Sequence, residues 1–175
     1  IFDKSGELAN REVRTVNIEN TTVDKGGHKH YMAKEIAEQP RVIGEALRYY
    51  LSNDGNSINL PGAGIDFSKI ERFTMVACGT AFYACLTAKY WFEQLAGIPV
   101  EVDVASEFRY REPPITPNTV ALFVSQSGET ADTLAALRYC EGKASSIVSV
   151  VNVPESSIAR ESNLALPILA GTEIG

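Results

Sequence analysis

Short apolar runs alternate with longer helical segments from Ile70 onward, and this alternation limits the possible folds more than any other feature of the chain. Strands are predicted at residues 73–78, 99–104, 119–124, 146–151 and 164–169. The run 119–124, Thr-Val-Ala-Leu-Phe-Val, lacks the polar alternation of a half-exposed strand, which indicates burial on both faces. Such burial is typical of a parallel sheet with helices on each side.

Helices are predicted between these strands, over residues 80–95, 129–139 and 157–161. The first of them is apolar almost all round, and Gly97 is expected to end it. Strands that alternate with helices predict right-handed βαβ units. We therefore expect an α/β fold, a doubly wound parallel sheet of about five strands flanked by helices, with the strand order 2-1-3-4-5.

The first 68 residues do not follow this alternation. Residues 1–28 are poor in large apolar side chains and are expected to form an arm or linker, with one short strand over residues 14–18. Residues 29–68 are expected to form an N-terminal helical arm, because apolar residues recur there at helical spacing. Pro40 is expected to start a second helix, which would make the arm a helical hairpin.

Composition and charge exclude several classes of function. The 175 residues include 22 acidic and 16 basic side chains, which gives a net charge of −6 and a pI near 5.0. We expect neither nucleic acid nor a membrane surface as a partner, because both attract surplus Lys and Arg. The longest uncharged run, residues 73–88, is shorter than the roughly 18 residues of a membrane-spanning helix. With 45% hydrophobic and 22% charged residues, the chain has the composition of a globular protein.

The cysteines and histidines give little support to metal or thiol chemistry. Cys78, Cys85 and Cys140 show neither a C-x-x-C pattern nor paired spacing, so we interpret them as thiols in a reducing, cytoplasmic compartment. His28 and His30 have no further metal ligand nearby and are interpreted as linker residues. We expect no metal and no cofactor. Cys78, at a predicted helix start, could be a nucleophile, but no His or Asn lies near it in the sequence.

Two strand-to-helix junctions carry residues suited to a ligand site. Cys78-Gly79-Thr80-Ala81 follows the first strand, and Ser125-Gln126-Ser127-Gly128-Glu129-Thr130 follows the third. With the strand order 2-1-3-4-5, the order reverses between these two strands, so both junctions are expected to face one crevice at the carboxyl edge of the sheet. Neither junction has the spacing of a dinucleotide or nucleoside triphosphate motif.

The chemistry of this crevice suits an anion. Helix N-termini offer unpaired N–H groups and a partial positive charge, and the two glycines let a ligand approach the backbone. Further donors come from one amide and four hydroxyls, those of Gln126, Thr80, Ser125, Ser127 and Thr130. In the competing interpretation, the hydroxyls only cap helices and the glycines only form turns. Glu129 would repel a phosphate, so we expect it to face solvent or to stabilise the helix start.

These motifs resemble one enzyme family. Cys78-Gly-Thr80, Ala105-Ser-Glu-Phe-Arg-Tyr-Arg111 and Ser125-Gln-Ser-Gly-Glu-Thr-Ala-Asp-Thr133 are similar to the first sugar isomerase (SIS) subdomain of the glutamine:fructose-6-phosphate amidotransferases. Residues 30–40 resemble the helix that opens the isomerase half of that family, and residues 152–175 resemble its later signatures. The resemblance extends over essentially the whole chain.

The resemblance implies a division of labour. In this family a glutaminase domain releases ammonia, and two SIS subdomains convert fructose 6-phosphate and ammonia to glucosamine 6-phosphate. Residues 1–28 would be the tail of the glutaminase domain and its linker, 29–68 the helical arm, and 69–175 a first SIS subdomain truncated at its C-terminal end. The residues implied to hold the sugar phosphate are Thr80, Ala81, Ser125, Gln126, Ser127 and Thr130. The family commonly has Ser where this chain has Ala81, so only the N–H of Ala81 could reach the phosphate.

The catalytic groups of the family would lie outside this chain. The base, the ring-opening histidine and the Schiff-base lysine belong to the second SIS subdomain or the C-terminal tail, and the glutaminase cysteine would precede Ile1. We therefore expect binding of fructose 6-phosphate or glucosamine 6-phosphate without turnover. The expected partners are the missing second SIS subdomain, the glutaminase domain and a second copy in a homodimer. The alternative is a non-catalytic SIS-domain sensor that reports a sugar phosphate to a partner domain.

Overall fold

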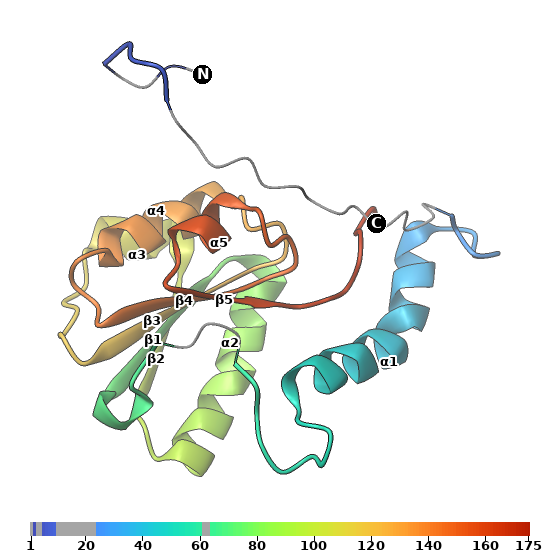
Figure 1. The fold of residues 1–175 in the computed structure, drawn as a ribbon, viewed down its shortest axis with the longest axis horizontal. Helices are drawn as coiled ribbons and strands as arrows, with labels where there is room; N and C mark the ends of the chain where they lie inside the picture. The colour runs from blue at the N-terminus through green and yellow to red at the C-terminus, as the bar shows by residue number, and fades with distance from the viewer. Residues whose placement is uncertain (1, 3–4, 10–23, 61–63) are drawn as a thin grey trace.

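A five-stranded parallel sheet forms the centre of the computed structural model, which describes residues 2, 5–9, 24–60 and 64–175 (Figure 1). In chain order the strands are β1 Arg72–Ala77, β2 Val100–Val104, β3 Thr119–Ser125, β4 Ser146–Val151 and β5 Leu164–Pro167. They lie in the spatial order β2-β1-β3-β4-β5, and every pair is parallel. The predicted α/β class and strand order are confirmed.

Helices lie on both faces of this sheet, as the buried strands require. Figure 1 shows α2 (Gly79–Trp91), which continues into the π-helical turn Phe92–Ala96, on one face. On the other face lie α3 (Ala105–Arg111), α4 (Ala131–Cys140) and α5 (Ser157–Glu161). Gly97 follows the π-helical turn with φ +64°, so the predicted helix end is confirmed.

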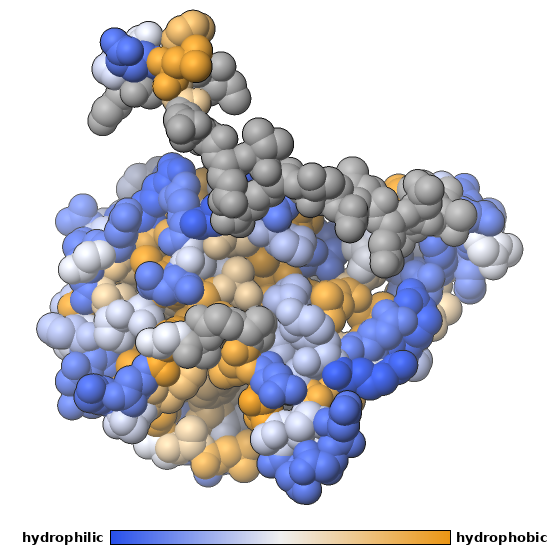
Figure 2. Space-filling view, viewed as in Figure 1, coloured by the Kyte–Doolittle hydropathy of each residue, from blue (hydrophilic) through white to orange (hydrophobic). Residues whose placement is uncertain are grey.

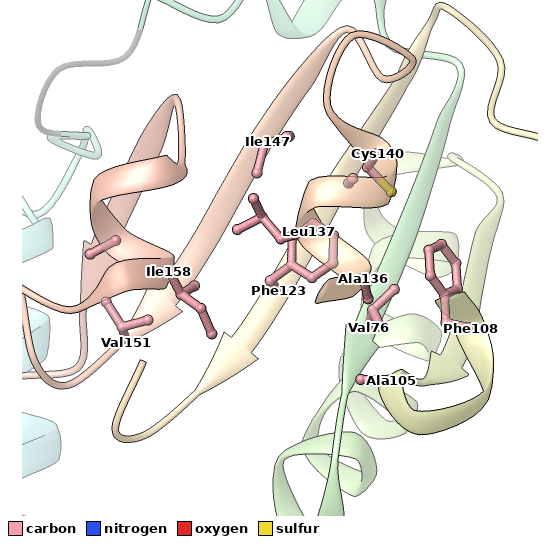
Figure 3. Close-up of a cluster of buried hydrophobic side chains, with 12 residues drawn as sticks. Val76, Ala105, Phe108, Phe123, Ala136, Leu137, Cys140, Ile147, Val151 and Ile158 are labelled. Carbon is pink, nitrogen blue, oxygen red and sulfur yellow. The ribbon is translucent and has the colours of Figure 1, made fainter. Parts of the chain in front are cut away.

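The core between the sheet and α3, α4 and α5 is closed. Figure 3 shows Val76 and Phe123 from the sheet beside Leu137 of α4 and Ile158 of α5, and all four side chains are at most 1% exposed. Alternate residues of the same strands, such as Met75 on β1, face α2 and belong to a second cluster. The strands are therefore apolar at consecutive positions because both of their faces contact side chains.

The prediction of a helical hairpin at the N-terminal arm is wrong. Residues Tyr31–Tyr50 form one helix, α1, with Pro40 inside it. Figure 1 shows this helix bent near its middle, which is the usual effect of a proline that removes one backbone hydrogen bond and whose ring crowds the preceding turn. A short 3-10 helix, η1 (Phe67–Lys69), precedes β1.

Helix α1 is attached to the end of β5 and to the segment that follows it. The hydroxyl of Tyr50 donates to the carbonyl of Pro167 at 2.7 Å, and the Glu35 carboxylate accepts from the N–H of Ile174 at 2.8 Å and of Gly175 at 3.1 Å. No residue of α1 is buried. The strand predicted at residues 14–18 lies outside the described residues. Among the helices that are described, none is long and apolar enough to cross a membrane.

Candidate functional site

The two strand-to-helix junctions meet at one cavity. It has a volume of about 270 Å³ and lies where β1 and β3, neighbours in the sheet, both end. Its lining residues are Cys78, Gly79, Thr80, Ala81, Val124, Ser125, Gln126, Ser127 and Thr130. All six predicted site residues are among them, so the predicted crevice exists in the structure.

Both helices that start at this cavity have open N-termini. The N-cap residues are Cys78 for α2 and Thr130 for α4, and neither side chain makes a capping hydrogen bond. The interpretation that these polar residues only cap helices therefore does not fit. Uncapped N–H groups and the positive end of the helix dipole favour an anion in the cavity.

Glycine is required in both junctions by the shape of the backbone. Gly79 has φ +57° and Gly128 has φ +65°, in the left-handed region that other residues rarely adopt. Gly128 is also tightly packed, because a Cβ there would lie 1.9 Å from Ser156 Oγ. Gly79 is therefore required by its backbone angle alone, because a Cβ there would meet no other atom, and Gly128 is required by both its backbone angle and its packing.

The hydroxyl groups of the second junction divide into two roles. Ser125 is buried, and its Oγ lies 2.9 Å from Thr130 Oγ1 and accepts from the N–H of Gly128 at 3.1 Å. These contacts brace the loop. Ser127 is exposed, and its Oγ accepts from the N–H of Glu129 at 3.2 Å, which leaves its own proton free to donate to a ligand. The hydroxyl of Thr80 is on an exposed residue as well.

Glu129 binds the start of α5 and not that of α4, the helix that it precedes. Its carboxylate accepts from the N–H of Ser157 at 2.7 Å, at the first residue of α5. This backbone hydrogen bond holds the pKa of Glu129 below its usual range. The acidic side chain is thus not among the residues that line the cavity.

One residue that supports the site was not predicted from the sequence. The N–H of Asn152 donates to the carbonyl of Gln126 at 3.0 Å. Its side chain accepts from the N–H of Ala170 at 2.8 Å and donates to the carbonyl of Gly171 at 2.6 Å. The available signal was its place directly after β4, because the strand order sets β4 beside β3.

The structure offers no metal centre in its described part, since no three His, Cys, Asp or Glu residues there are grouped to hold an ion. Cys85 and Cys140 are free and buried, and burial raises the pKa of their thiols to about 11 and about 12. Cys78 is half-buried and lines the cavity. His28 and His30 are exposed and precede α1.

Comparisons with known proteins agree with this geometry. A sequence profile of the SIS domain matches residues 66–175. The chain is 53% identical over all its 175 residues to a glutamine–fructose-6-phosphate aminotransferase (isomerizing) of Brucella abortus and 54% identical to one of Bradyrhizobium diazoefficiens. It spans 29% of the length of these relatives.

A solved structure gives the same result. The C-terminal domain of glucosamine-fructose-6-phosphate aminotransferase from Francisella tularensis superposes with a TM-score of 0.81 at 42% identity, over 87% of this chain and 43% of that one. A glucosamine-6-phosphate deaminase of Thermotoga maritima, at 22% identity and a TM-score of 0.65, shares the fold alone. With the profile match over most of its length, the chain belongs to the SIS domain family.

Proposed function

We propose that this chain is the sugar-phosphate-binding lobe of a glutamine–fructose-6-phosphate aminotransferase (isomerizing), the enzyme that forms glucosamine 6-phosphate. The observation that carries the proposal is the cavity at the ends of β1 and β3, where two uncapped helix N-termini meet. The names of the relatives at 53% and 54% identity support fructose 6-phosphate as the substrate.

The phosphate would be bound without a cationic side chain. None of the residues that line the cavity is Lys or Arg, and the donors there are backbone N–H groups with the hydroxyls of Thr80 and Ser127. Helix N-termini bind phosphate in this way. An acidic chain of net charge −6 can therefore hold an anionic ligand. Ala81 would contribute only its N–H.

A titration of the chain with three ligands tests this proposal. Fructose 6-phosphate and inorganic phosphate should bind in isothermal titration calorimetry, and phosphate-free fructose should not. Ser127→Ala should weaken fructose 6-phosphate binding about tenfold or more, because a hydrogen bond to a charged group contributes roughly 1.5–3 kcal/mol. Equal affinity of the phosphorylated and unphosphorylated sugars, or no effect of Ser127→Ala, would refute the phosphate site.

We propose further that the chain binds its ligand without converting it. Its two histidines lie in the segment before α1, and no Lys, His, Asp or Glu lines the cavity. Amino transfer and ring opening need general acids and bases at the sugar. Incubation with fructose 6-phosphate and ammonium salts should leave the sugar unchanged in a proton NMR time course. Product formation would contradict this part of the proposal.

The proposed function also implies the partners of the chain. Residues 1–28 would be a glutaminase tail and linker, residues 29–68 the helical arm, and residues 69–175 the first SIS subdomain. The apolar surface beside α2 would contact the second SIS subdomain or a second copy of the chain. A homodimer predicts a concentration-dependent sedimentation coefficient in analytical ultracentrifugation, and a monomer at all concentrations would argue against it.

A further inference from the structure

One residue of the Ser-Gln-Ser-Gly-Glu-Thr motif has no place in the proposed function. Glu129 brings a negative charge next to a cavity for an anion, and by itself this charge would weaken phosphate binding. The residues 125–130 are called the phosphate loop below. We propose that Glu129 is a positioning residue, whose carboxylate fixes the phosphate loop by binding the first turn of α5. The proposal rests on the proposed function.

The first turn of α5 receives acceptors from the phosphate loop. The N–H of Ser157 donates to Glu129 Oε1 at 2.7 Å, and the N–H of Ile158 donates to the carbonyl of Gly128 at 3.0 Å. The third N–H, of Ala159, donates to Ser156 Oγ at 3.4 Å. N–H groups at the start of a helix have no partner within the helix. Two of the three are therefore satisfied only because the loop lies against them.

The contact surface between loop and helix leaves little room for movement. A Cβ at Gly128 would lie 1.9 Å from Ser156 Oγ and 2.4 Å from Ser156 Cβ, so the backbone of Gly128 is in close contact with the side chain of Ser156. The N–H of Asn152 holds the carbonyl of Gln126 at 3.0 Å on the same side. Gln126 and Gly128 of the loop accept hydrogen bonds from residues 152–158 through their backbone carbonyls. Among the loop groups that make these bonds, only the Glu129 carboxylate is a side chain. It is therefore the contact that a substitution can remove without changing the backbone.

The position of Glu129 also determines that of Ser127. The N–H of Glu129 donates to Ser127 Oγ at 3.2 Å, so the hydroxyl proposed to donate to phosphate is oriented by the residue whose side chain is fixed on α5. A loop that is already held in its bound shape loses less conformational entropy when the ligand binds. Glu129 would thus raise the affinity for phosphate although its own charge opposes binding.

Two substitutions separate positioning from charge. Glu129→Gln removes the charge but keeps an oxygen that can accept from the N–H of Ser157, whereas Glu129→Ala removes both. If charge alone mattered, both variants would bind phosphate more tightly than the wild type. Positioning predicts that Glu129→Ala binds fructose 6-phosphate about tenfold more weakly, the effect of losing one hydrogen bond of about 1.4 kcal/mol, and that Glu129→Gln binds at least as well as the wild type.

Glu161→Ala is the matched control. It removes a carboxylate of the same charge from α5, and that carboxylate contacts Arg138 of α4 at 2.6 Å and not the loop. Its affinity for fructose 6-phosphate should stay within about twofold of the wild-type value, because the group lies outside the loop contacts.

The experiment combines calorimetry on the 175-residue chain with amide hydrogen exchange. Fructose 6-phosphate and inorganic phosphate are titrated into the wild type and the three variants, after circular dichroism has shown that each is folded. Exchange at residues 126–130 and Ser157 should accelerate in Glu129→Ala and stay near wild type in Glu129→Gln. Unchanged exchange in Glu129→Ala, or an affinity equal to or above that of the wild type, overturns the positioning role. Lack of phosphate binding by the wild type refutes the proposed function instead, while the exchange data still decide whether Glu129 orders the loop.

Discussion

The two faces of the sheet are built from the same strands but are covered to different extents. On the face with α3, α4 and α5, none of the core side chains exceeds 7% exposure. On the face with α2, a groove of about 600 Å³ remains open, and its floor includes Leu122, Val150 and Leu166 of β3, β4 and β5. Figure 2 shows hydrophobic side chains at the surface around α2. We call these the closed face and the open face.

This difference shows that strands with apolar residues at consecutive positions are suited to burial on both faces, but that the strands alone do not determine how completely each face is covered. Residues alternate along β3 between the faces, with Phe123 in the closed cluster and its neighbours Leu122 and Val124 in the open one. The cavity proposed to bind the sugar phosphate lies between the two faces, since α2 starts on the open face and α4 on the closed one. Its geometry therefore depends on both faces, and unequal packing should be visible in the stability of variants.

The largest expected effect comes from deleting the same side chain on each face. Leu137→Ala on the closed face should lower the free energy of unfolding by about 3 kcal/mol, because a buried leucine loses its burial energy and leaves a cavity. Leu166→Ala, at a half-buried position of the open groove, should cost about 1 kcal/mol. Urea unfolding followed by circular dichroism measures both. Equal losses would show that the open face is covered in solution.

A hydroxyl in place of a methyl group gives a smaller contrast. Val76→Thr puts a hydroxyl at a fully buried position of the closed face, where an unpaired polar group costs about 1–3 kcal/mol. Val150→Thr on the open face should cost less than about 1 kcal/mol, since water reaches this half-buried position. Thermal unfolding of the two variants with the wild type as reference provides the comparison. A larger loss for Val150→Thr would reverse the assignment of the faces.

The reactivity of the two buried thiols, Cys85 and Cys140, compares the packing of the open and closed faces without any substitution. Cys85 lines the open groove, and Cys140 belongs to the closed cluster. Burial raises the pKa to about 11 for Cys85 and about 12 for Cys140, so both are neutral and slow to react at neutral pH. Alkylation of the native chain, read by mass spectrometry of peptides, should modify Cys78 first, Cys85 next and Cys140 last. Reaction of Cys140 before Cys85 would contradict the closed packing.

The same pKa shifts predict how stability changes with pH. A thiol whose pKa is higher in the folded state than in the unfolded one contributes to stability as long as the unfolded thiol also keeps its proton. This contribution is complete below the unfolded pKa of about 8.5 and is lost as the pH rises through the folded values. Cys140→Ala should therefore unfold with a weaker dependence on pH above about 9 than the wild type.

The smallest effect is expected at the surface of the closed face. Arg138 of α4 binds the Glu161 carboxylate of α5 through Nε at 2.7 Å and Nη2 at 2.6 Å, and this contact lowers the pKa of Glu161. The contribution is present above the unfolded pKa and is lost as the pH falls through the lowered folded value. Glu161→Gln should reduce stability only slightly, and less in 1 M salt, because both side chains are well exposed. A loss as large as that of Leu137→Ala would mean that the pair holds α5 in place.

Much of the fold was open to prediction, with a clear limit at Pro40. The apolar runs set the strands to within a residue or two, and the expected short helix at residues 157–161 has those bounds in the structure. Helix α1 does not break at Pro40. A proline inside a helix raises the free energy of the helix but does not have to end it, and here the residues on both sides remain helical. The low helix propensity of proline therefore indicated an unfavourable position at residue 40, but it did not show that the helix would continue through it.

The candidate site divides in a similar way. Thr80, Ser127 and the two junction glycines could be recognised because they follow strands directly and precede helices. Asn152 had only its place directly after β4 as a signal, and the contact of Glu129 with Ser157 had none, since the partners lie 26 and 28 residues apart along the chain. Such contacts arise only when β3 and β4 lie side by side.

The sequence by itself determined the class of this protein, because the period of apolar residues and the glycines at strand ends act locally, through backbone geometry and burial. The tertiary structure alone decided the rest. It made one face of the sheet closed and the other open, left two helix N-termini uncapped at one cavity, and turned the Glu129 carboxylate onto α5. These features depend on tertiary contacts between segments that are distant in the sequence, and the local pattern of residues does not specify such contacts.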